Sequence, residues 1–134
     1  NVGSNKKIKN GMAVLDGENF IGRIVDVTFF SSRVLLVTDL NSKIPVIIEP
    51  SANHAILGGR GSNKPSLEYL PENSSIEEGS KVYTSGKGGI FLPGIPIGEV
   101  KKDNDVIGVS LFSDLDQITF VNVNLSKFEN KEKL

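Results

Sequence analysis

The chain contains no cysteine and no tryptophan, and its single histidine is His54. The absence of cysteine excludes disulfide bonds and thiolate metal sites, and it leaves the redox compartment open. One histidine among scattered carboxylates provides no pair of metal ligands at a useful spacing. The segment Asp103-Asn104-Asp105 lacks the glycine and the distal glutamate of a calcium-binding loop. The sequence therefore predicts no metal site.

Neither charge nor hydrophobicity is concentrated in one part of the chain. The 15 basic and 16 acidic residues are interspersed and give a net charge of −1. This balance argues against a basic face that would bind nucleic acid or an anionic membrane. The longest apolar clusters, at residues 34–37 and 44–48, are far shorter than the roughly 18 residues of a membrane span. The 134 residues begin without a methionine or a signal peptide, so we expect a fragment of a longer protein.

Glycine and proline are abundant in one stretch, around which the rest of the chain is organised. Residues 82–100 read VYTSGKGGIFLPGIPIGEV and combine five glycines with two prolines. Glycine permits positive φ and close backbone approach, whereas proline fixes φ and removes a hydrogen-bond donor. This composition excludes a helix and predicts a strand-turn-strand segment with sharp corners.

The remaining segments have the pattern of short strands. We expect about ten or eleven of them at spacings of roughly 8–12 residues, without an amphipathic helix, which is typical of an all-β sandwich or barrel pair. Residues 113–117 form a helical turn or a loop in this prediction. Residues 1–9 are polar and loosely held, and the charged tail at residues 127–134 is frayed or helical and carries no core. The predicted strands lie at residues 12–15, 20–29, 34–38, 44–49, 54–57, 67–70, 81–84, 97–101, 106–112 and 118–125.

The sequence lacks the arrangement of serine, histidine and carboxylate that a serine hydrolase needs. A serine nucleophile needs a histidine base that is itself oriented by a carboxylate. His54 is the single candidate base and lies at the start of a predicted strand. Ser85 lies among glycines, but the Gly-x-Ser-x-Gly motif of hydrolases is absent because Tyr83 and Lys87 replace its two glycines. The sequence therefore predicts no catalytic residues and no enzyme activity.

Cofactor motifs that bind phosphate are absent as well. The pair Gly86-Lys87 is followed by glycine instead of serine or threonine, and Lys81 stands where a P-loop has its first glycine. The Gly59-Arg60-Gly61 segment lacks the third glycine of a dinucleotide-binding turn. Both segments are interpreted as turns, and we expect no cofactor.

Candidate partner-binding residues remain. Phe29 and Phe30 place two aromatic side chains on opposite faces of a strand end, so at least one is expected to be exposed. Phe91 and Leu92 lie at a corner bent by glycine and proline, where burying both is difficult. Exposed aromatic side chains are enriched in interface hot spots, although they also close the ends of barrels. Arg60, between two glycines, contacts either backbone carbonyls or a partner, and open edge strands offer a further binding route.

The segment at residues 84–100 resembles the TSGxGGxFPxGxPxGxV signature of the MreC family of bacterial rod-shape-determining proteins. Further pieces of the family pattern precede it in the same order, at residues 21–27, 32–39, 44–46, 67–71 and 76–79. There are three departures. Ser80 replaces the aspartate after a turn glycine, Asn19-Phe20 replaces Gly-Leu, and Leu92 is an extra residue before Pro93. These differences affect turns and surface more than the fold.

The resemblance implies an all-β fold of two small six-stranded β-barrels in the double-barrel layout of chymotrypsin-like proteases, with short or no helices. The first barrel is expected near residues 1–40, with strands from residues 101–134 returning to it, and the second near residues 41–100. No internal sequence repeat supports this division.

The resemblance also implies a function. MreC-like proteins are non-enzymatic scaffolds of peptidoglycan elongation, and we expect this chain to bind, and to organise or activate, a class B penicillin-binding transpeptidase. Expected further partners are MreD, RodZ, RodA and MreB, directly or indirectly, together with self-association. The expected location is the periplasm, with anchoring in the inner membrane only through an N-terminal helix absent from this fragment. The alternatives are a divergent chymotrypsin-like serine hydrolase and a peptidoglycan-binding β module, and with no tryptophan and two tyrosines the chain offers few aromatic faces for sugars.

Overall fold

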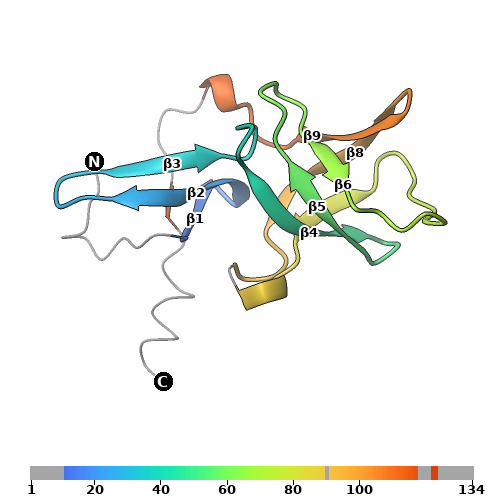
Figure 1. Cartoon of the computed structure of the whole chain (residues 1–134), viewed down its shortest axis with the longest axis horizontal. Coiled ribbons are helices and arrows are strands. Elements are labelled where there is room, and N and C mark those ends of the chain that lie inside the picture. Colours follow the sequence, from blue (N-terminus) through green and yellow to red (C-terminus); the bar gives the residue numbers. More distant parts are fainter. Residues whose placement is uncertain (1–10, 90, 118–121, 124–134) are drawn as a thin grey trace.

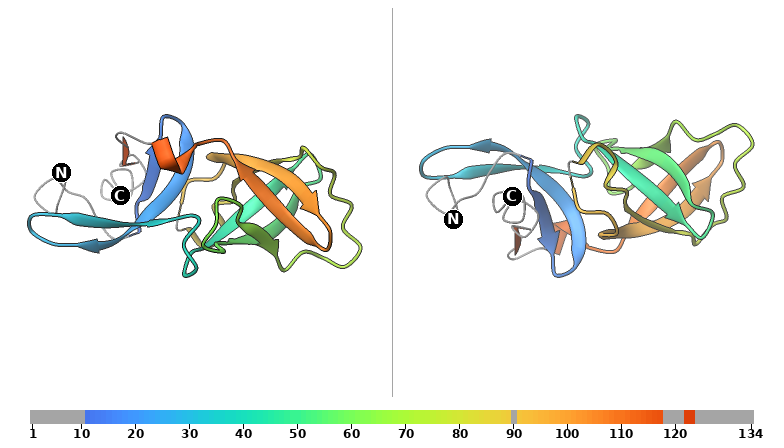
Figure 2. Two further views of the ribbon diagram at one scale, coloured as in Figure 1. Left: turned by 90° about the horizontal axis from the view of Figure 1, so that it is seen from above. Right: turned by 90° about the horizontal axis from the view of Figure 1, so that it is seen from below.

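The computed structural model describes residues 11–89, 91–117 and 122–123. These residues form two units that lie side by side along the longest axis of the molecule, a four-stranded sheet and a closed barrel (Figures 1 and 2). The described part of the chain contains strands and short 3₁₀ segments but no α-helix. The sheet consists of β1 (Ala13–Asp16), β2 (Asn19–Val27), β3 (Ser32–Leu36) and β10 (Asn122–Val123). The barrel consists of β4 (Lys43–Glu49), β5 (Asn53–Gly58), β6 (Ser66–Glu68), β7 (Lys81–Thr84), β8 (Pro96–Asp103) and β9 (Val106–Leu111), and the 3₁₀ segments are η2 (Lys87–Gly89) and η3 (Leu115–Gln117).

The four-stranded sheet has the order β10-β1-β2-β3, with antiparallel pairing throughout. A tight turn at Gly17, with φ of 61°, joins β1 to β2, because glycine adopts this conformation without strain. Gly22 allows β3 to approach closely, since a Cβ atom there would lie 2.5 Å from the Leu35 carbonyl oxygen. A small cluster of buried side chains in this unit consists of Met12, Val14, Ile21 and Ile24. Beyond this cluster the β2–β3 hairpin extends away from the barrel (Figure 1).

The barrel closes in the order β4-β5-β6-β9-β8-β7. Strict alternation along β4 directs Ile44, Val46 and Ile48 inward and leaves Pro45 and Ile47 half-buried on the outer face. Pro45 lies inside a strand that is paired on both sides, with β5 and with β7. The main hydrophobic core fills the barrel and includes Val46, Leu57, Val82, Ile97, Val100 and Val109.

The chain crosses between the two units twice. At the first crossing, the Gly59 amide donates to the Ser42 carbonyl oxygen at 3.0 Å and the Gly61 amide donates to the Thr38 carbonyl oxygen at 2.8 Å. A Cβ atom at Gly59 would lie 1.9 Å from the Asp39 carbonyl oxygen, so this approach requires glycine. These contacts fasten the turn between β3 and β4 to the loop that follows β5.

The second crossing runs from β9 to η3. The Phe112 amide donates to the Ile97 carbonyl oxygen of the barrel at 3.0 Å, and Asn19 of the sheet donates through Nδ2 to Ser113 Oγ at 3.3 Å. Leu115 packs against both hydrophobic clusters. The main cluster itself contains Phe20 and Val37 beside the barrel residues, so one continuous core joins the two units.

The structure confirms the all-β class of the sequence prediction and one of its two expected barrels. The all-β fold and one closed six-stranded barrel are present, whereas the described residues of the other unit form an open sheet, so a double barrel is not confirmed. The expected boundary at residue 100 falls inside β8, which continues to Asp103 and turns through Asn104, at a φ of 54°, into β9. A tight hairpin keeps its second strand beside the first, so β9 stays in the barrel.

Some predicted segments lie partly or wholly outside the described residues. A strand was predicted at residues 118–125, and its described part is β10. Strand β10 pairs with β1 and therefore belongs to the four-stranded sheet. The rest of that predicted strand, at residues 118–121 and 124–125, is outside the described part of the chain. The same holds for residues 1–9, predicted to be loosely held, and for residues 127–134, predicted to carry no core.

Candidate partner-binding surface

The loop between β7 and β8 is held by the buried side chain of Thr84. Its Oγ1 donates to the Leu92 carbonyl oxygen at 2.6 Å and accepts from the Ile95 amide at 2.9 Å. The Gly94 amide donates to the Thr84 carbonyl oxygen at 2.8 Å. The loop is therefore fixed against the barrel, and two of these three hydrogen bonds depend on a hydroxyl at position 84.

This folded loop buries Phe91, which had been predicted as a contact residue. Phe91 is 4% exposed, and its ring meets the ring of Phe20 edge to face, with centroids 5.0 Å apart. The loop turns back and places the Phe91 ring between barrel and sheet, so Phe91 offers no exposed ring, and its role in partner binding stays a prediction. Leu92 is half-buried and packs against the same core, so the loop corner offers little apolar surface.

The tip of the β2–β3 hairpin presents both of the other predicted aromatic residues. Phe29 is 64% exposed and Phe30 is 77% exposed, and their rings meet edge to face with centroids 4.8 Å apart. The flanking residues close the turn, since the Thr28 amide donates to the Ser31 carbonyl oxygen at 2.7 Å and the Ser31 amide donates to Thr28 Oγ1 at 3.0 Å. The result is an uncharged aromatic pair on a well-defined turn.

Arg60 is exposed and lies in the loop after β5. It lines a shallow pocket of about 300 Å³ together with Lys64 and Asp103. No hydrogen bond or ion pair of Arg60 occurs among the described residues, so the predicted contact to backbone carbonyls is not formed there. Its predicted role in partner binding stays a prediction.

Sequence reasoning missed Tyr69, which is 83% exposed. Strand alternation would place Tyr69 on the same face as the buried Leu67. Its φ of 62° rotates the chain at this point and directs the ring to solvent. A left-handed conformation is rare for an aromatic residue, so the local sequence does not predict the positive φ of Tyr69.

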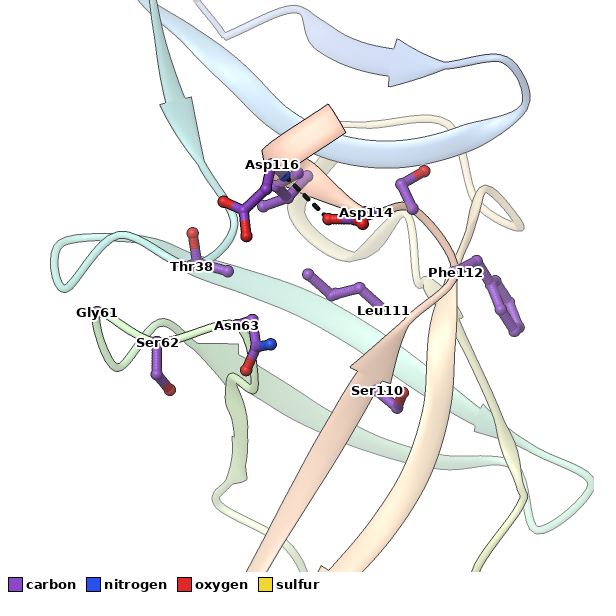
Figure 3. A pocket seen from close by; sticks show the side chains of 11 residues that line it. Thr38, Gly61, Ser62, Asn63, Ser110, Leu111, Phe112, Asp114 and Asp116 are labelled. Carbon is purple, nitrogen blue, oxygen red and sulfur yellow. Dashed lines mark hydrogen bonds between the residues drawn. The ribbon is translucent and has the colours of Figure 1, made fainter. Parts of the chain in front are cut away.

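A groove of about 660 Å³ lies between the two units (Figure 3). Thr38, Asn63 and Leu111 surround this space, while the ring of Phe112 points away from it. The amide of Asp116 donates to Asp114 Oδ1 at 3.0 Å, which closes the short turn of η3. The groove is therefore mainly polar and does not present an aromatic face.

An ion pair beside an aromatic ring lies on the outer face of the barrel. Lys81 Nζ donates to Glu99 Oε2 at 2.8 Å, across the β7–β8 pair, and lies 5.7 Å from the centroid of the Phe112 ring. The hydrogen bond and the positive charge of Lys81 lower the pKa of the half-buried Glu99 carboxyl below its ordinary value. The pair keeps Glu99 ionised over a wider range of acid pH.

The described residues do not assemble a catalytic or metal centre. His54 lies exposed on β5, and no serine or carboxylate within the described ranges forms a hydrogen bond with it. Ser85 Oγ instead accepts from the Lys87 amide at 3.1 Å, within its own loop. The described part of the chain also lacks a group of three metal-ligating side chains. The hydrolase alternative therefore gains no support.

In residues 11–89, 91–117 and 122–123 we find no helix whose length and apolarity would suit a membrane crossing.

Comparison with known proteins identifies the family. The chain matches the family model described as Rod shape-determining protein MreC, barrel core, over residues 1–124. It is 39% identical over 124 residues to the cell shape-determining protein MreC of Cereibacter sphaeroides, an alignment that covers 92% of this chain and 41% of that relative. The chain thus spans less than half the length of this curated relative.

Two solved structures share the fold. The crystal structure of MreC from Pseudomonas aeruginosa has a TM-score of 0.80 at 29% identity, covering 90% of this chain and 83% of that one. A chain of the complex between Penicillin-Binding Protein (PBP2) and MreC from Helicobacter pylori has a TM-score of 0.67 at 20% identity, covering 83% and 74%. The match over residues 1–124 and the 39% identity establish that this chain belongs to the MreC family of rod shape-determining proteins, as its barrel core.

Proposed function

We propose that this chain is a non-enzymatic scaffold module of the machinery that elongates the bacterial cell wall, and that it binds a class B penicillin-binding transpeptidase. The observation that carries the proposal is the complex between Penicillin-Binding Protein (PBP2) and MreC from Helicobacter pylori, whose fold this chain shares. Family membership supports the role in cell shape. By binding the synthase, the module either positions it or activates it.

The aromatic pair at the hairpin tip is the proposed contact. Phe29 and Phe30 are exposed, uncharged and held on a closed turn. A fixed turn loses little conformational entropy on binding, and aromatic side chains are enriched among interface hot spots. The tip extends away from the barrel (Figure 1), so a partner can reach it without contact with the barrel.

The wider assembly belongs to the same proposal. The module acts on the periplasmic side of the inner membrane, in a longer protein that is anchored there. It works within a complex with MreD, RodZ, RodA and MreB, by direct or indirect contact, and it self-associates. The peptidoglycan-binding alternative is disfavoured because the polar groove lacks the aromatic face on which sugar rings stack.

The test is binding of the 134-residue chain to the immobilised periplasmic domain of its own elongation transpeptidase, measured by interferometry. Phe30→Ala should weaken binding by about tenfold or more, as expected for a hot spot. Tyr69→Ala, which removes another exposed aromatic ring, is the matched control and should change affinity by less than about twofold. Equal losses in both variants would remove the hairpin tip as the specific contact, and no saturable binding up to ~100 µM would contradict the partner.

A further inference from the structure

A second surface feature lies on the outer face of β4 and β7. Alternation along these paired strands buries Val46 and Val82 and leaves Ile47, Glu49 and Tyr83 on the outside. Ile47 and Tyr83 are direct cross-strand partners, so their side chains lie next to each other on this face.

These side chains line one wall of a hollow of about 470 Å³, and the β7–β8 loop forms the other wall with Ser85 and Pro93. The loop wall is fixed, since Thr84 holds the backbone at Leu92 and at Gly94. The Pro93 ring also packs against Gly86, where a Cβ atom would lie 2.9 Å from the ring. The hollow therefore exists before any ligand binds.

The charge of the hollow is set by Glu49. Lys81 lies opposite Glu49 in the β4–β7 register, but its ammonium group is engaged by Glu99 on the other side at 2.8 Å. Among the described residues no ion pair or hydrogen bond of the Glu49 side chain is formed. The hollow thus combines the Glu49 carboxylate with apolar walls made of Ile47, Tyr83 and Pro93.

We infer that this hollow binds an arginine side chain of the penicillin-binding protein, an inference that rests on the proposed function. A guanidinium group is planar, stacks on an aromatic ring and donates two parallel hydrogen bonds to a carboxylate. Its aliphatic stem suits the surfaces of Ile47 and Pro93. A lysine would use only the charge, and an acidic side chain would be repelled by Glu49. The hollow and the hairpin tip then form two separate contacts with the partner.

The first experiment measures binding of the 134-residue chain to the transpeptidase domain at two salt concentrations. Glu49→Gln should weaken binding by about five- to tenfold at low salt and should reduce the salt dependence. Glu72→Gln removes an exposed carboxylate from a loop outside the hollow and should change affinity by less than about twofold. Equal affinities for Glu49→Gln and the unmodified chain would overturn the inference and leave the proposed function intact.

The second experiment does not need the partner. Two-dimensional NMR of the chain titrated with N-acetyl-arginine amide should shift the amide signals of Ile47, Tyr83 and Ser85, and Glu49→Gln should abolish these shifts. N-acetyl-norleucine amide, which is apolar and uncharged, should leave the signals unchanged. Equal shifts with both probes would identify an unspecific apolar hollow, and no shift with either would exclude a guanidinium site. Arginine-specific shifts without transpeptidase binding would contradict the proposed partner and retain the site.

Discussion

At the scale of single residues, Thr84 shows how one hydroxyl shapes a surface. The motif residue looks like an ordinary strand threonine in the sequence, yet its Oγ1 bonds to the backbone at both Leu92 and Ile95. These bonds fix the loop between β7 and β8. The loop buries Phe91 and forms one wall of the hollow beside Tyr83. A buried side chain thereby determines the shape of the exposed surface around it.

We predict that Thr84→Val destabilises the chain by roughly 2–4 kcal/mol, because it leaves a buried amide and a buried carbonyl unpaired. Thr84→Ser keeps the hydroxyl and should lose about 1 kcal/mol, the value of a buried methyl group. Urea unfolding followed by fluorescence of the tyrosines measures both values. Equal losses in the two variants would show that the hydroxyl is not what holds the loop.

Residues also mark the limit of sequence reasoning. Exposure of at least one ring of Phe29 and Phe30 was predictable, because two successive side chains at a strand end cannot both face one core, but exposure of both was not. The burial of Phe91 was not predictable, since it depends on Phe20, which is distant in sequence. Tyr69 was missed for a different reason, because a positive φ reverses the face that alternation assigns.

At the scale of elements, the turn between β3 and β4 and the loop after β5 act as one junction. Gly59 and Gly61 donate to the carbonyl groups of Ser42 and Thr38, and the absence of a side chain at Gly59 lets the two backbones touch. The pattern of glycines predicted a turn after β5 but not the contact of this turn with the turn between β3 and β4. The strands themselves were predicted well by alternation, since β4 and β7 obey it without exception.

We predict that Gly59→Ala destabilises the chain by about 3 kcal/mol or more, because the new Cβ atom would meet the rigid backbone at Asp39. Gly17→Ala is the control, since its turn has open space and the cost is backbone strain of about 1–2 kcal/mol. Thermal unfolding of the two variants compares these costs. A smaller loss for Gly59→Ala than for Gly17→Ala would contradict the tight junction.

At the scale of the whole molecule, sheet and barrel share one hydrophobic core. Phe20 from the sheet and Phe91 from the barrel loop meet at the centre of the contact. Strand periodicity predicts the individual strands but not the closure of the barrel. The pair β6–β9 takes part in that closure, and it joins two strands that are distant in sequence through a single pair of residues, Ser66 and Gly108. For the same reason the sequence did not indicate that β9 stays with the barrel.

We predict that Phe91→Ala lowers the free energy of unfolding by about 3–5 kcal/mol and does so for both units together. Hydrogen exchange should therefore show faster opening of β1 and β2 as well as of β7 and β8. Phe30→Ala removes an exposed ring and should stay within about 0.5 kcal/mol of the unmodified chain. Loss of protection confined to the barrel would show that the two units unfold independently.

The double crossing between sheet and barrel has a mechanical consequence. Two units joined by one linker extend under tension, because that linker alone bears the force. Here one backbone segment enters the barrel near Ser42 and another returns near Ser113, and each is bonded to both sides. We expect a pull between the hairpin tip and the outer barrel face to be divided between these two segments, so that sheet and barrel resist separation more than two units joined by one linker would.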